Sequence, residues 1–194
     1  KENSGSVKYK DLIRKPADLL NYFKDIGRVQ EKDFKTWSEP DQIAFLINAY
    51  NAFTLQLVKD YYPITSIKKV PGTKDAMKMK FFRLFGREMS LESLQNDYLR
   101  AHYSEPRFHF ALNCATVACP RLRNEAYVGA RLSEQLDDQV KTFMRDTSRN
   151  KIDVTAKNLE LSQMFEWFAS DFNKGDMTLT KWVAPYISDD EAVR

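Results

Sequence analysis

The chain has few of the residues that define metal-rich or disulfide-rich proteins, with only two cysteines and two histidines among its 194 residues. Two cysteines are too few for a disulfide-rich scaffold or, alone, for a structural zinc site. Thirty basic residues against 27 acidic ones leave a formal charge of +3, which does not by itself indicate a nucleic-acid partner. We therefore regard nucleic acid as an unlikely ligand and predict no cofactor.

Long hydrophobic runs are also missing. The longest uncharged stretch is 43–58 (IAFLINAYNAFTLQLV), and four polar residues interrupt it. A helix that crosses a bilayer needs about 20 mainly apolar residues. The sequence therefore predicts no membrane span.

The material for a folded core is present, since 43% of the residues are hydrophobic and 13% are aromatic. The length suits one domain. We expect residues 1–15 to form a flexible, polar N-terminal lead-in and residues 16–194 to form a single domain. The order of elements predicts a helix-rich α+β fold with a small, mostly antiparallel sheet.

Capping signals and apolar spacing place the elements. Ser38, followed by a proline and an acid at the third helical position, predicts a helix start, and this helix should end before Pro63. Ser90 and Ser162 should cap two further helices. The remaining expected elements are helices at about 17–25 and 132–143, short strands at about 81–85 and 107–113, and a hairpin formed by KIDVT and LELS.

Two asparagines lie on one face of the long helix. Asn48 and Asn51 are three residues apart, and apolar residues cover much of the remaining circumference. A buried amide left unpaired costs about 1–3 kcal/mol, so both side chains need partners. They either form a structural network with nearby backbone or line a cavity, where they orient a substrate or a catalytic group.

The segment RFHFALN carries one of the two histidines. If 107–113 is a strand, Phe108, Phe110 and Leu112 point into the core, while Arg107, His109, Ala111 and Asn113 point the other way. That second face is mixed, so His109 and Asn113 should lie where the strand meets a helix or a cleft. His109 is then either a satisfied structural residue or a catalyst.

Cys114 is the candidate nucleophile. A tight turn into a helix after the strand would lower the pKa of its thiol and supply backbone N–H groups to an oxyanion. Five extended residues span about 16 Å, whereas a base must come within about 3 Å of its nucleophile. His109 can therefore serve Cys114 only if the chain turns back sharply after Leu112, and His102 is the other possible base.

The two cysteines have four possible states. A free thiol packed as a small apolar group comes first, a disulfide between Cys114 and Cys119 second, a nucleophile third and a metal site last. On a regular helix, residues five apart rise about 7.5 Å, beyond the usual Cα limit of about 6.8 Å for a disulfide. The bond would need a non-helical turn, which the pair Cys119-Pro120 would permit.

Four blocks now identify a family resemblance. AFLINAYNAFT, SLESLQNDYLR, RFHFALNCATVACPRLRNEAY and LSQMFEWFASDF occur in this order, with VKYKDL near the start. Together they resemble the domain of unknown function family 547, shared by bacteria and plants, over about residues 7–172, with a helical extension after it. The resemblance implies no known activity. Many bacterial members look exported, which, with the absent initiator methionine, predicts a periplasmic or secreted protein.

The resemblance also shows a departure. Relatives typically carry a Glu-His pair where this chain has Gln95-Asn96. The plant branch keeps that pair and the first cysteine, and lacks a histidine at the position of His109 and a cysteine at that of Cys119. The histidine of the pair is thus the implied base of any thiol triad. Because an amide cannot accept the proton, either His102 or His109 has this role here or this member is non-catalytic.

The segment 68–87 is strongly basic, with seven lysines and arginines against Asp75. Phe81, Phe82 and Phe85 are interleaved with them. The segment could grip a polyanion, or it could be a solvated loop whose aromatic side chains enter the core. Weak, salt-insensitive retention on heparin would exclude polyanion binding.

We therefore predict a pocket that binds a small molecule or peptide, in a domain that is non-catalytic in this member. The alternative is a cysteine-dependent acyl-transfer enzyme, similar to an amide or peptide hydrolase, with Cys114 as nucleophile, a histidine such as His109 as base and Asn48 as an orienting donor. The further binding candidates are Asn51, Gln95, Asn96, Arg107 and Asn113.

Overall fold

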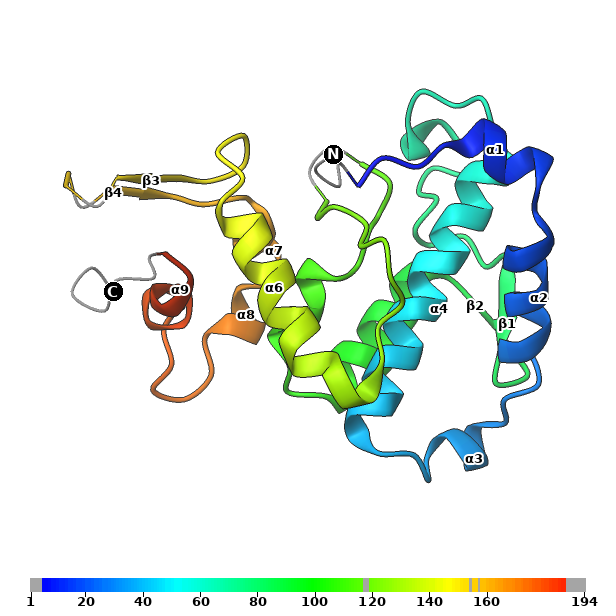
Figure 1. The fold of residues 1–194 in the computed structure, drawn as a ribbon, viewed down its shortest axis with the longest axis horizontal. Coiled ribbons are helices and arrows are strands. Elements are labelled where there is room, and N and C mark those ends of the chain that lie inside the picture. Colours follow the sequence, from blue (N-terminus) through cyan, green and yellow to red (C-terminus); the bar gives the residue numbers. More distant parts are fainter. Residues whose placement is uncertain (1–4, 117–118, 154, 157, 188–194) are drawn as a thin grey trace.

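The long helix α4 (Glu39–Asp60) runs through the middle of the fold (Figure 1). This computed structural model describes residues 5–116, 119–153, 155–156 and 158–187. The other helices are α1 (Tyr9–Arg14), α2 (Ala17–Ile26), α3 (Glu31–Phe34), α5 (Leu91–Ser93), α6 (Leu132–Met144), α7 (Met164–Trp167), α8 (Ala169–Phe172) and α9 (Leu179–Ile187). Three 3₁₀ helices, Ile67–Lys69, Pro106–Phe110 and Gly129–Arg131, and a π-helix, Leu94–Arg100, complete the helical part.

The strands form two separate antiparallel hairpins. β1 (Phe82–Leu84) pairs with β2 (Arg87–Met89), and β3 (Lys151–Asp153) pairs with β4 (Asn158–Glu160). Phe85 and Gly86, between β1 and β2, both have positive φ, as a tight two-residue hairpin turn requires. The predicted helix-rich α+β class and the predicted KIDVT–LELS hairpin are confirmed.

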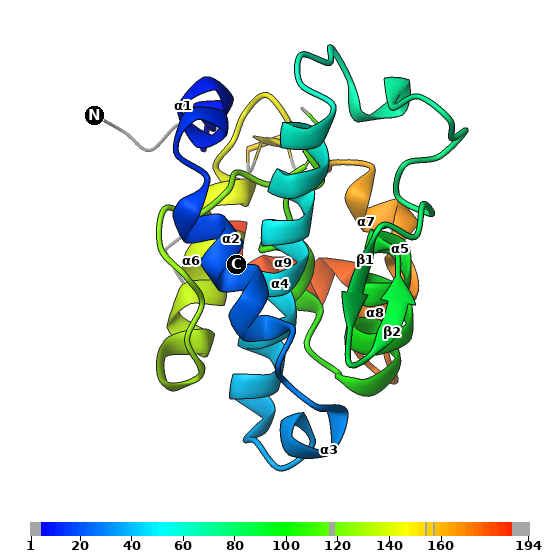
Figure 2. The same ribbon diagram turned by 90° about the vertical axis from the view of Figure 1, so that its right-hand side faces the viewer.

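The sequence signals for α4 are also confirmed. The Ser38 hydroxyl accepts a hydrogen bond from the Asp41 backbone N–H at 3.3 Å, and a proline stands in the first turn. Most α4 side chains from Ile43 to Val58 are buried, because helices and loops surround this helix on several sides. Figure 1 shows α6 on one side of α4 and α2 with the β1–β2 hairpin on the other, and Figure 2 shows α5 beside that hairpin.

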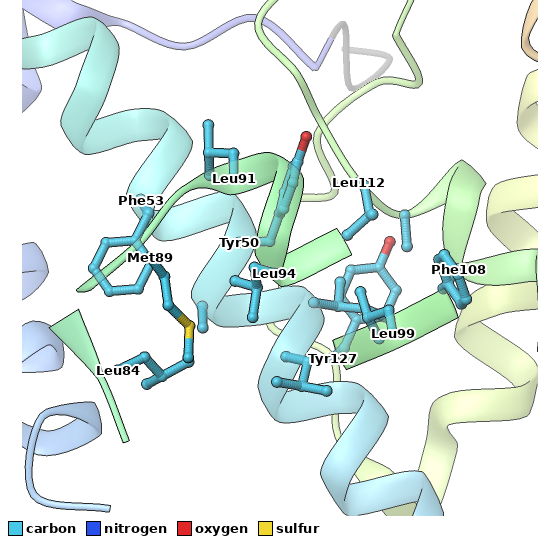
Figure 3. Close-up of a cluster of buried hydrophobic side chains, with 14 of the residues drawn as sticks. Tyr50, Phe53, Leu84, Met89, Leu91, Leu94, Leu99, Phe108, Leu112 and Tyr127 are labelled. Carbon is cyan, nitrogen blue, oxygen red and sulfur yellow. The ribbon is translucent and has the colours of Figure 1, made fainter. Parts of the chain in front are cut away.

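The core has two parts. The larger part surrounds α4 and includes Tyr50, Phe53, Leu94 and Leu99 (Figure 3). The smaller part is rich in aromatic residues and joins α6 to the C-terminal helices; its buried members are Phe110, Val140, Phe143, Met144, Met164, Phe165, Phe172 and Val183. The 3₁₀ helix Pro106–Phe110 connects the two parts, because Phe108 belongs to the first and Phe110 to the second.

The predicted strand at 107–113 is wrong. The structure has the 3₁₀ helix Pro106–Phe110 there, because the Glu105 carboxylate accepts from the Arg107 N–H at 3.1 Å and proline occupies the first helical position. Side chains therefore do not alternate between two faces, and Phe108, His109, Phe110, Ala111 and Leu112 are all buried.

The N-terminal segment 1–15, which the sequence predicts to be a flexible lead-in, contains the helix α1. No residue of α1 is buried, and residues 1–4 lie outside the described part of the chain. The predicted cap at Ser162 precedes α7, where its hydroxyl accepts from the Met164 N–H at 3.3 Å. None of the described helices is both long enough and apolar enough to span a bilayer.

Candidate functional site

A cavity of about 440 Å³ lies between the cysteine loop and α7. Its wall is mainly apolar and includes Trp167, which is 58% exposed. The lining residues are Tyr50, Ile67, Lys74, Asp75, Ala76, Met77, Gln95, His109, Leu112, Cys114, Thr116, Cys119, Pro120, Met164, Trp167 and Phe168. A concave, mostly apolar site of this size with a few polar groups is typical of small-molecule binding.

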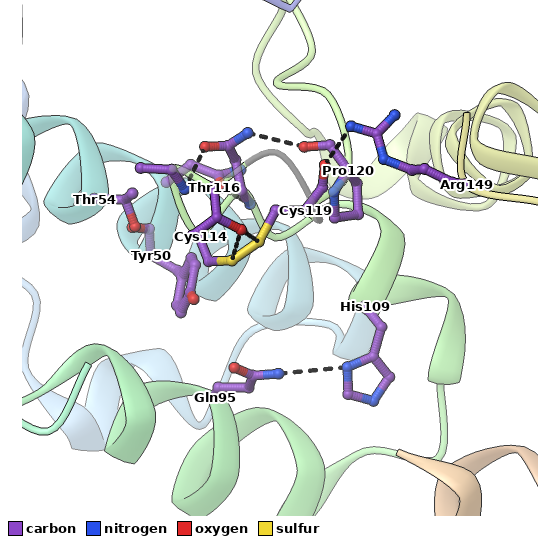
Figure 4. The surroundings of a disulfide bond; sticks show 12 residues. Tyr50, Thr54, Gln95, His109, Cys114, Thr116, Cys119, Pro120 and Arg149 are labelled. Atoms are coloured by element: carbon purple, nitrogen blue, oxygen red, sulfur yellow. Dashed lines mark hydrogen bonds between the residues drawn. A yellow bond between two sulfur atoms is a disulfide. The ribbon is translucent and has the colours of Figure 1, made fainter. Parts of the chain in front are cut away.

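One wall of this cavity is formed by the cysteine pair. The structure joins Cys114 and Cys119 in a disulfide whose Cα atoms are 5.7 Å apart, in place of the free thiol that the sequence analysis ranks first (Figure 4). Ala115 has a φ of 53°, so the chain turns tightly directly after Cys114. The Thr116 hydroxyl lies 3.5 Å from the Cys114 sulfur and 3.2 Å from the Cys119 sulfur.

The helix expected after Cys114 is absent from the described residues 111–116 and 119–128. The thiol-activating helix N-terminus that the sequence suggested is therefore missing there. The backbone bends enough after Leu112 for His109 and Cys114 to line the same cavity. This follows from the 3₁₀ helix and the turn after it, since a strand would have kept the two residues far apart.

His109 is held from both sides of its ring. Its Nε2 lies 2.8 Å from the Asp171 carboxylate, and its Nδ1 lies 3.4 Å from the Gln95 amide nitrogen. Phe168 stacks on the ring at a centroid distance of 4.0 Å. Burial lowers the pKa of His109, and the hydrogen bond to Asp171 offsets this only in part. The imidazole is therefore neutral at pH 7.

Asp171 is also the partner of Arg100. The guanidinium donates to both carboxylate oxygens, at 2.7 and 3.1 Å, and lies over the Phe168 ring. Partial burial opposes ionisation of Asp171, but hydrogen bonds from His109 and Arg100 outweigh it and hold the pKa well below its usual range. Because an ionised carboxylate only accepts hydrogen bonds, His109 carries its proton on Nε2. Its Nδ1 accepts from Gln95.

The π-helix Leu94–Arg100 supplies Gln95, Asn96 and Arg100 to this cluster. The Arg100 guanidinium also donates to the Asn96 side-chain oxygen at 3.1 Å. Short π segments occur often at functional sites, because the wider turn displaces side chains from the regular helical faces. Gln95 lines the cavity, whereas Asn96 supports Arg100 from outside it.

The two candidate asparagines of α4 bind backbone. The Asn48 amide donates to the Tyr127 carbonyl at 2.8 Å and accepts from the Tyr127 N–H at 2.9 Å. The Asn51 amide donates to the Ala111 carbonyl and accepts from the Asn113 N–H, both at 2.9 Å. These contacts match the structural network that the sequence allowed, and neither residue lines the cavity.

Asn113 closes the cysteine loop. Its amide donates to the Pro120 carbonyl at 2.8 Å and accepts from the Ala115 N–H at 3.0 Å. The bond to Pro120 ties the beginning of the loop to its end, next to the disulfide. Asn113 therefore shapes the cavity wall from behind and does not line the cavity.

Two further candidates lie elsewhere. Arg107 is bonded to Glu105 and Asp137 at the surface end of α6, away from the cavity. His102 is exposed, its Nδ1 lies 3.1 Å from the Tyr98 carbonyl, and it lines a different hollow near Glu31. Of the two histidines, only His109 lines the cavity with Cys114.

The sequence did not identify Tyr50, Arg100 and Asp171 as members of this site. Asp171 lies 62 positions from His109 along the chain, so no local pattern joins them. Two features of the sequence could have suggested two of them. Asp171 lies in the block LSQMFEWFASDF, and Tyr50 lies between Asn48 and Asn51 on the long helix.

Four consecutive residues of the basic segment, Lys74 to Met77, line the cavity, and Lys74 is the one basic residue among them. Lys78 pairs with Glu92 and Arg87 pairs with Glu31. Phe82 is buried and stacks on Phe53 with a centroid distance of 3.8 Å. The aromatic side chains therefore enter the core, and polyanion binding stays a prediction.

The described residues contain no group of three or more His, Cys, Asp or Glu side chains placed to hold a metal ion. In the structure the two sulfurs of the cavity wall are bonded to each other, so neither is a free thiol there.

Comparison with known proteins gives one match. Residues 34–144 match the family described as "Protein of unknown function, DUF547". No curated protein and no solved structure matches the chain. The match spans more than half of the 194 residues and includes Gln95, His109 and both cysteines, while Asp171 and Phe168 follow it in the chain. The chain belongs to the DUF547 family.

Proposed function

We propose that this protein binds a small, largely apolar molecule or peptide side chain in the cavity beside the disulfide and does not turn it over. The observation that supports this proposal is the mainly apolar, about 440 Å³ hollow whose two sulfurs are bonded to each other. Binding of an apolar ligand to such a hollow is favourable, because the ligand displaces water from the apolar wall and from the exposed tryptophan.

Filling the cavity should abolish binding. We expect Met77→Trp to weaken binding of the fluorescent probe N-phenyl-1-naphthylamine by at least about tenfold, because Met77 lines the hollow and the indole occupies the ligand's volume. The measurement is a fluorescence titration with excitation above the absorption of tryptophan.

The matched control is Met177→Trp. Met177 is 44% exposed and does not line the cavity, so this variant should bind the probe as the wild type does. Absence of saturable probe binding to the wild type would refute the proposal. Equal affinity of both variants would place the binding site elsewhere.

We also propose that the disulfide is the resting state of the protein in an oxidising, extracytoplasmic compartment. The supporting observations are the 5.7 Å separation of the Cα atoms and the non-helical turn that closes the loop. The bond removes the thiol that acyl transfer needs and stiffens one wall of the cavity.

Both cysteines should therefore resist alkylation. Without reductant, we expect the folded wild type to gain no mass from iodoacetamide, and two additions after reduction and unfolding. The Cys119→Ser variant is the control, since it leaves Cys114 unpaired and half-buried, and it should be labelled without reductant. Labelling of the untreated wild type would show free thiols and contradict the proposed state.

A second function, cysteine-dependent acyl transfer, has one specific observation in its favour. His109 has an unprotonated Nδ1, is oriented by Asp171 and lines the same cavity as Cys114. If the reduced protein uses this base, its Cys114 should be alkylated well below pH 8, and His109→Phe should slow that reaction. Equal rates in both reduced proteins would exclude the pairing.

A further inference from the structure

We propose that the cavity recognises a neutral carboxamide on an apolar body, with the Tyr50 hydroxyl donating to the ligand carbonyl and Gln95 Oε1 accepting from the ligand N–H. This inference rests on the proposed binding function and names the ligand class. The supporting observations are two polar groups of the apolar wall, the Tyr50 hydroxyl and the Gln95 side-chain oxygen, that form no hydrogen bond with any described residue.

Tyr50 is the first of these groups. The residue is only 1% exposed and lines the cavity. Its backbone carbonyl accepts from the Thr54 hydroxyl, while its own hydroxyl bonds to no described residue. Figure 3 shows the hydroxyl at the edge of the buried cluster, and Figure 4 shows it below the disulfide. Burial raises the pKa of Tyr50, so the group keeps its proton and can donate. Buried hydroxyls are normally paired, which makes this one a candidate ligand contact.

Gln95 is the second group. Its amide nitrogen donates to His109 Nδ1, which leaves Oε1 without a hydrogen-bond donor among the described residues. Figure 4 shows the nitrogen toward His109 and the oxygen turned away from it, on the side of Tyr50 and the disulfide. The oxygen is therefore available to accept a hydrogen bond from a molecule in the cavity.

A chain of hydrogen bonds fixes this orientation. Arg100 holds Asp171 through two bonds, Asp171 accepts from His109 Nε2, and His109 Nδ1 in turn accepts from Gln95. If Gln95 flipped, its oxygen would face the lone pair of Nδ1, which is repulsive. His109 is thus a positioning residue that keeps an acceptor pointing into the cavity.

The pair of groups selects a carboxamide over a carboxylate. A carboxylate has no N–H for Gln95 Oε1, and its charge would lose hydration against an apolar wall. The charged side chains of the wall, Lys74 and Asp75, are both exposed and of opposite sign, so they supply no net compensating charge. An amide carries a carbonyl acceptor and an N–H donor on the same carbon, which suits a site that offers one donor and one acceptor.

The test compares three probes that share a butylphenyl body. They are 4-butylbenzamide, methyl 4-butylbenzoate and butylbenzene, each measured by displacement of N-phenyl-1-naphthylamine. The ester keeps the carbonyl and lacks the donor, and butylbenzene lacks both polar atoms. We expect the wild type to bind the amide about tenfold more tightly than the ester, and the ester more tightly than butylbenzene.

Three variants assign the contacts. Gln95→Leu should remove the preference for the amide over the ester. Tyr50→Phe should weaken binding of the amide and the ester alike and leave butylbenzene binding unchanged. It should also fold normally, because the hydroxyl bonds no described residue. His109→Phe should reduce the amide-to-ester ratio without changing butylbenzene affinity, since the released Gln95 can turn.

The outcomes separate the two proposals. If none of the three probes displaces N-phenyl-1-naphthylamine, the proposed binding function fails. If all three bind equally to the wild type, the cavity binds apolar molecules but the carboxamide inference is wrong. If the amide preference survives in Gln95→Leu, the donor contact is made by another residue and the inference is also wrong.

Discussion

Asn51→Leu is expected to lower the free energy of unfolding by about 3 kcal/mol, because it leaves two backbone groups unpaired in a buried position. The lost bonds are those to the Ala111 carbonyl and the Asn113 N–H, each at 2.9 Å, and Asn51 is only 7% exposed. The measurement is chemical denaturation followed by circular dichroism. The loss should accompany weaker probe binding, since Asn113 closes the loop that forms the cavity wall.

The control for this prediction is Asn21→Leu on α2. Asn21 is exposed, so this variant makes the same change of side chain without unpairing a buried group, and its stability should stay within about 0.5 kcal/mol of the wild type. A stable Asn51→Leu protein that has lost only ligand binding would contradict the structural role and favour a direct role of the amide in the site.

Asp171→Ala is expected to cost about 2–3 kcal/mol of stability, because it removes the acceptor of charge-assisted hydrogen bonds. The buried His109 Nε2–H and the Arg100 guanidinium would both lose their partner. Asp138→Ala is the control: Asp138 is 57% exposed and pairs with Arg123 at the surface, where ion pairs contribute about 0–1 kcal/mol.

The difference between wild type and Asp171→Ala should depend on pH. The pKa of Asp171 is held low in the folded protein, so its contribution is complete above the unfolded value of about 3.9. It is lost as the pH falls through the lower folded pKa. Denaturation at pH 7 and below pH 4 should therefore show a gap that narrows in acid. A gap that stays constant would mean that Asp171 is not the ionised partner of Arg100.

Elements with strong local signals could be predicted from the sequence. α4 begins at a serine cap and ends before Pro63, and α6 follows the apolar spacing of Leu132, Leu136, Val140 and Phe143. The β3–β4 hairpin also carries a local signal, two short runs around a turn, whereas only the first strand of the β1–β2 hairpin was predicted. Local hydrogen bonding and apolar periodicity determine these elements, and both are visible in a single sequence.

The strand predicted at 107–113 is wrong because short apolar runs look alike in strands and in buried 3₁₀ helices. The deciding interactions are the Glu105 carboxylate on the Arg107 N–H and the burial of both Phe108 and Phe110, in two different parts of the core. The second of these is a tertiary contact, and no local pattern predicts it.

The site itself was only half predictable. His109, Cys114 and Gln95 have unusual chemistry for their positions and could be singled out, whereas Asp171 lies 62 positions from the histidine it orients. Tyr50 resembles any other core aromatic residue on the face of a buried helix. Its proposed role arises only from a hydroxyl that bonds no described residue and lies at the cavity, which is a property of the packed structure.

The cavity is lined by two parts of the chain, one inside the family match and one after it. Tyr50, Gln95 and the disulfide loop belong to the region shared with the family, while Met164, Trp167 and Phe168 follow residue 144, where that match ends. The polar pair of the cavity and part of its apolar wall therefore lie in separate parts of the sequence. A substitution at Met164, Trp167 or Phe168 can change the shape of the apolar wall while Tyr50 and Gln95 keep their positions.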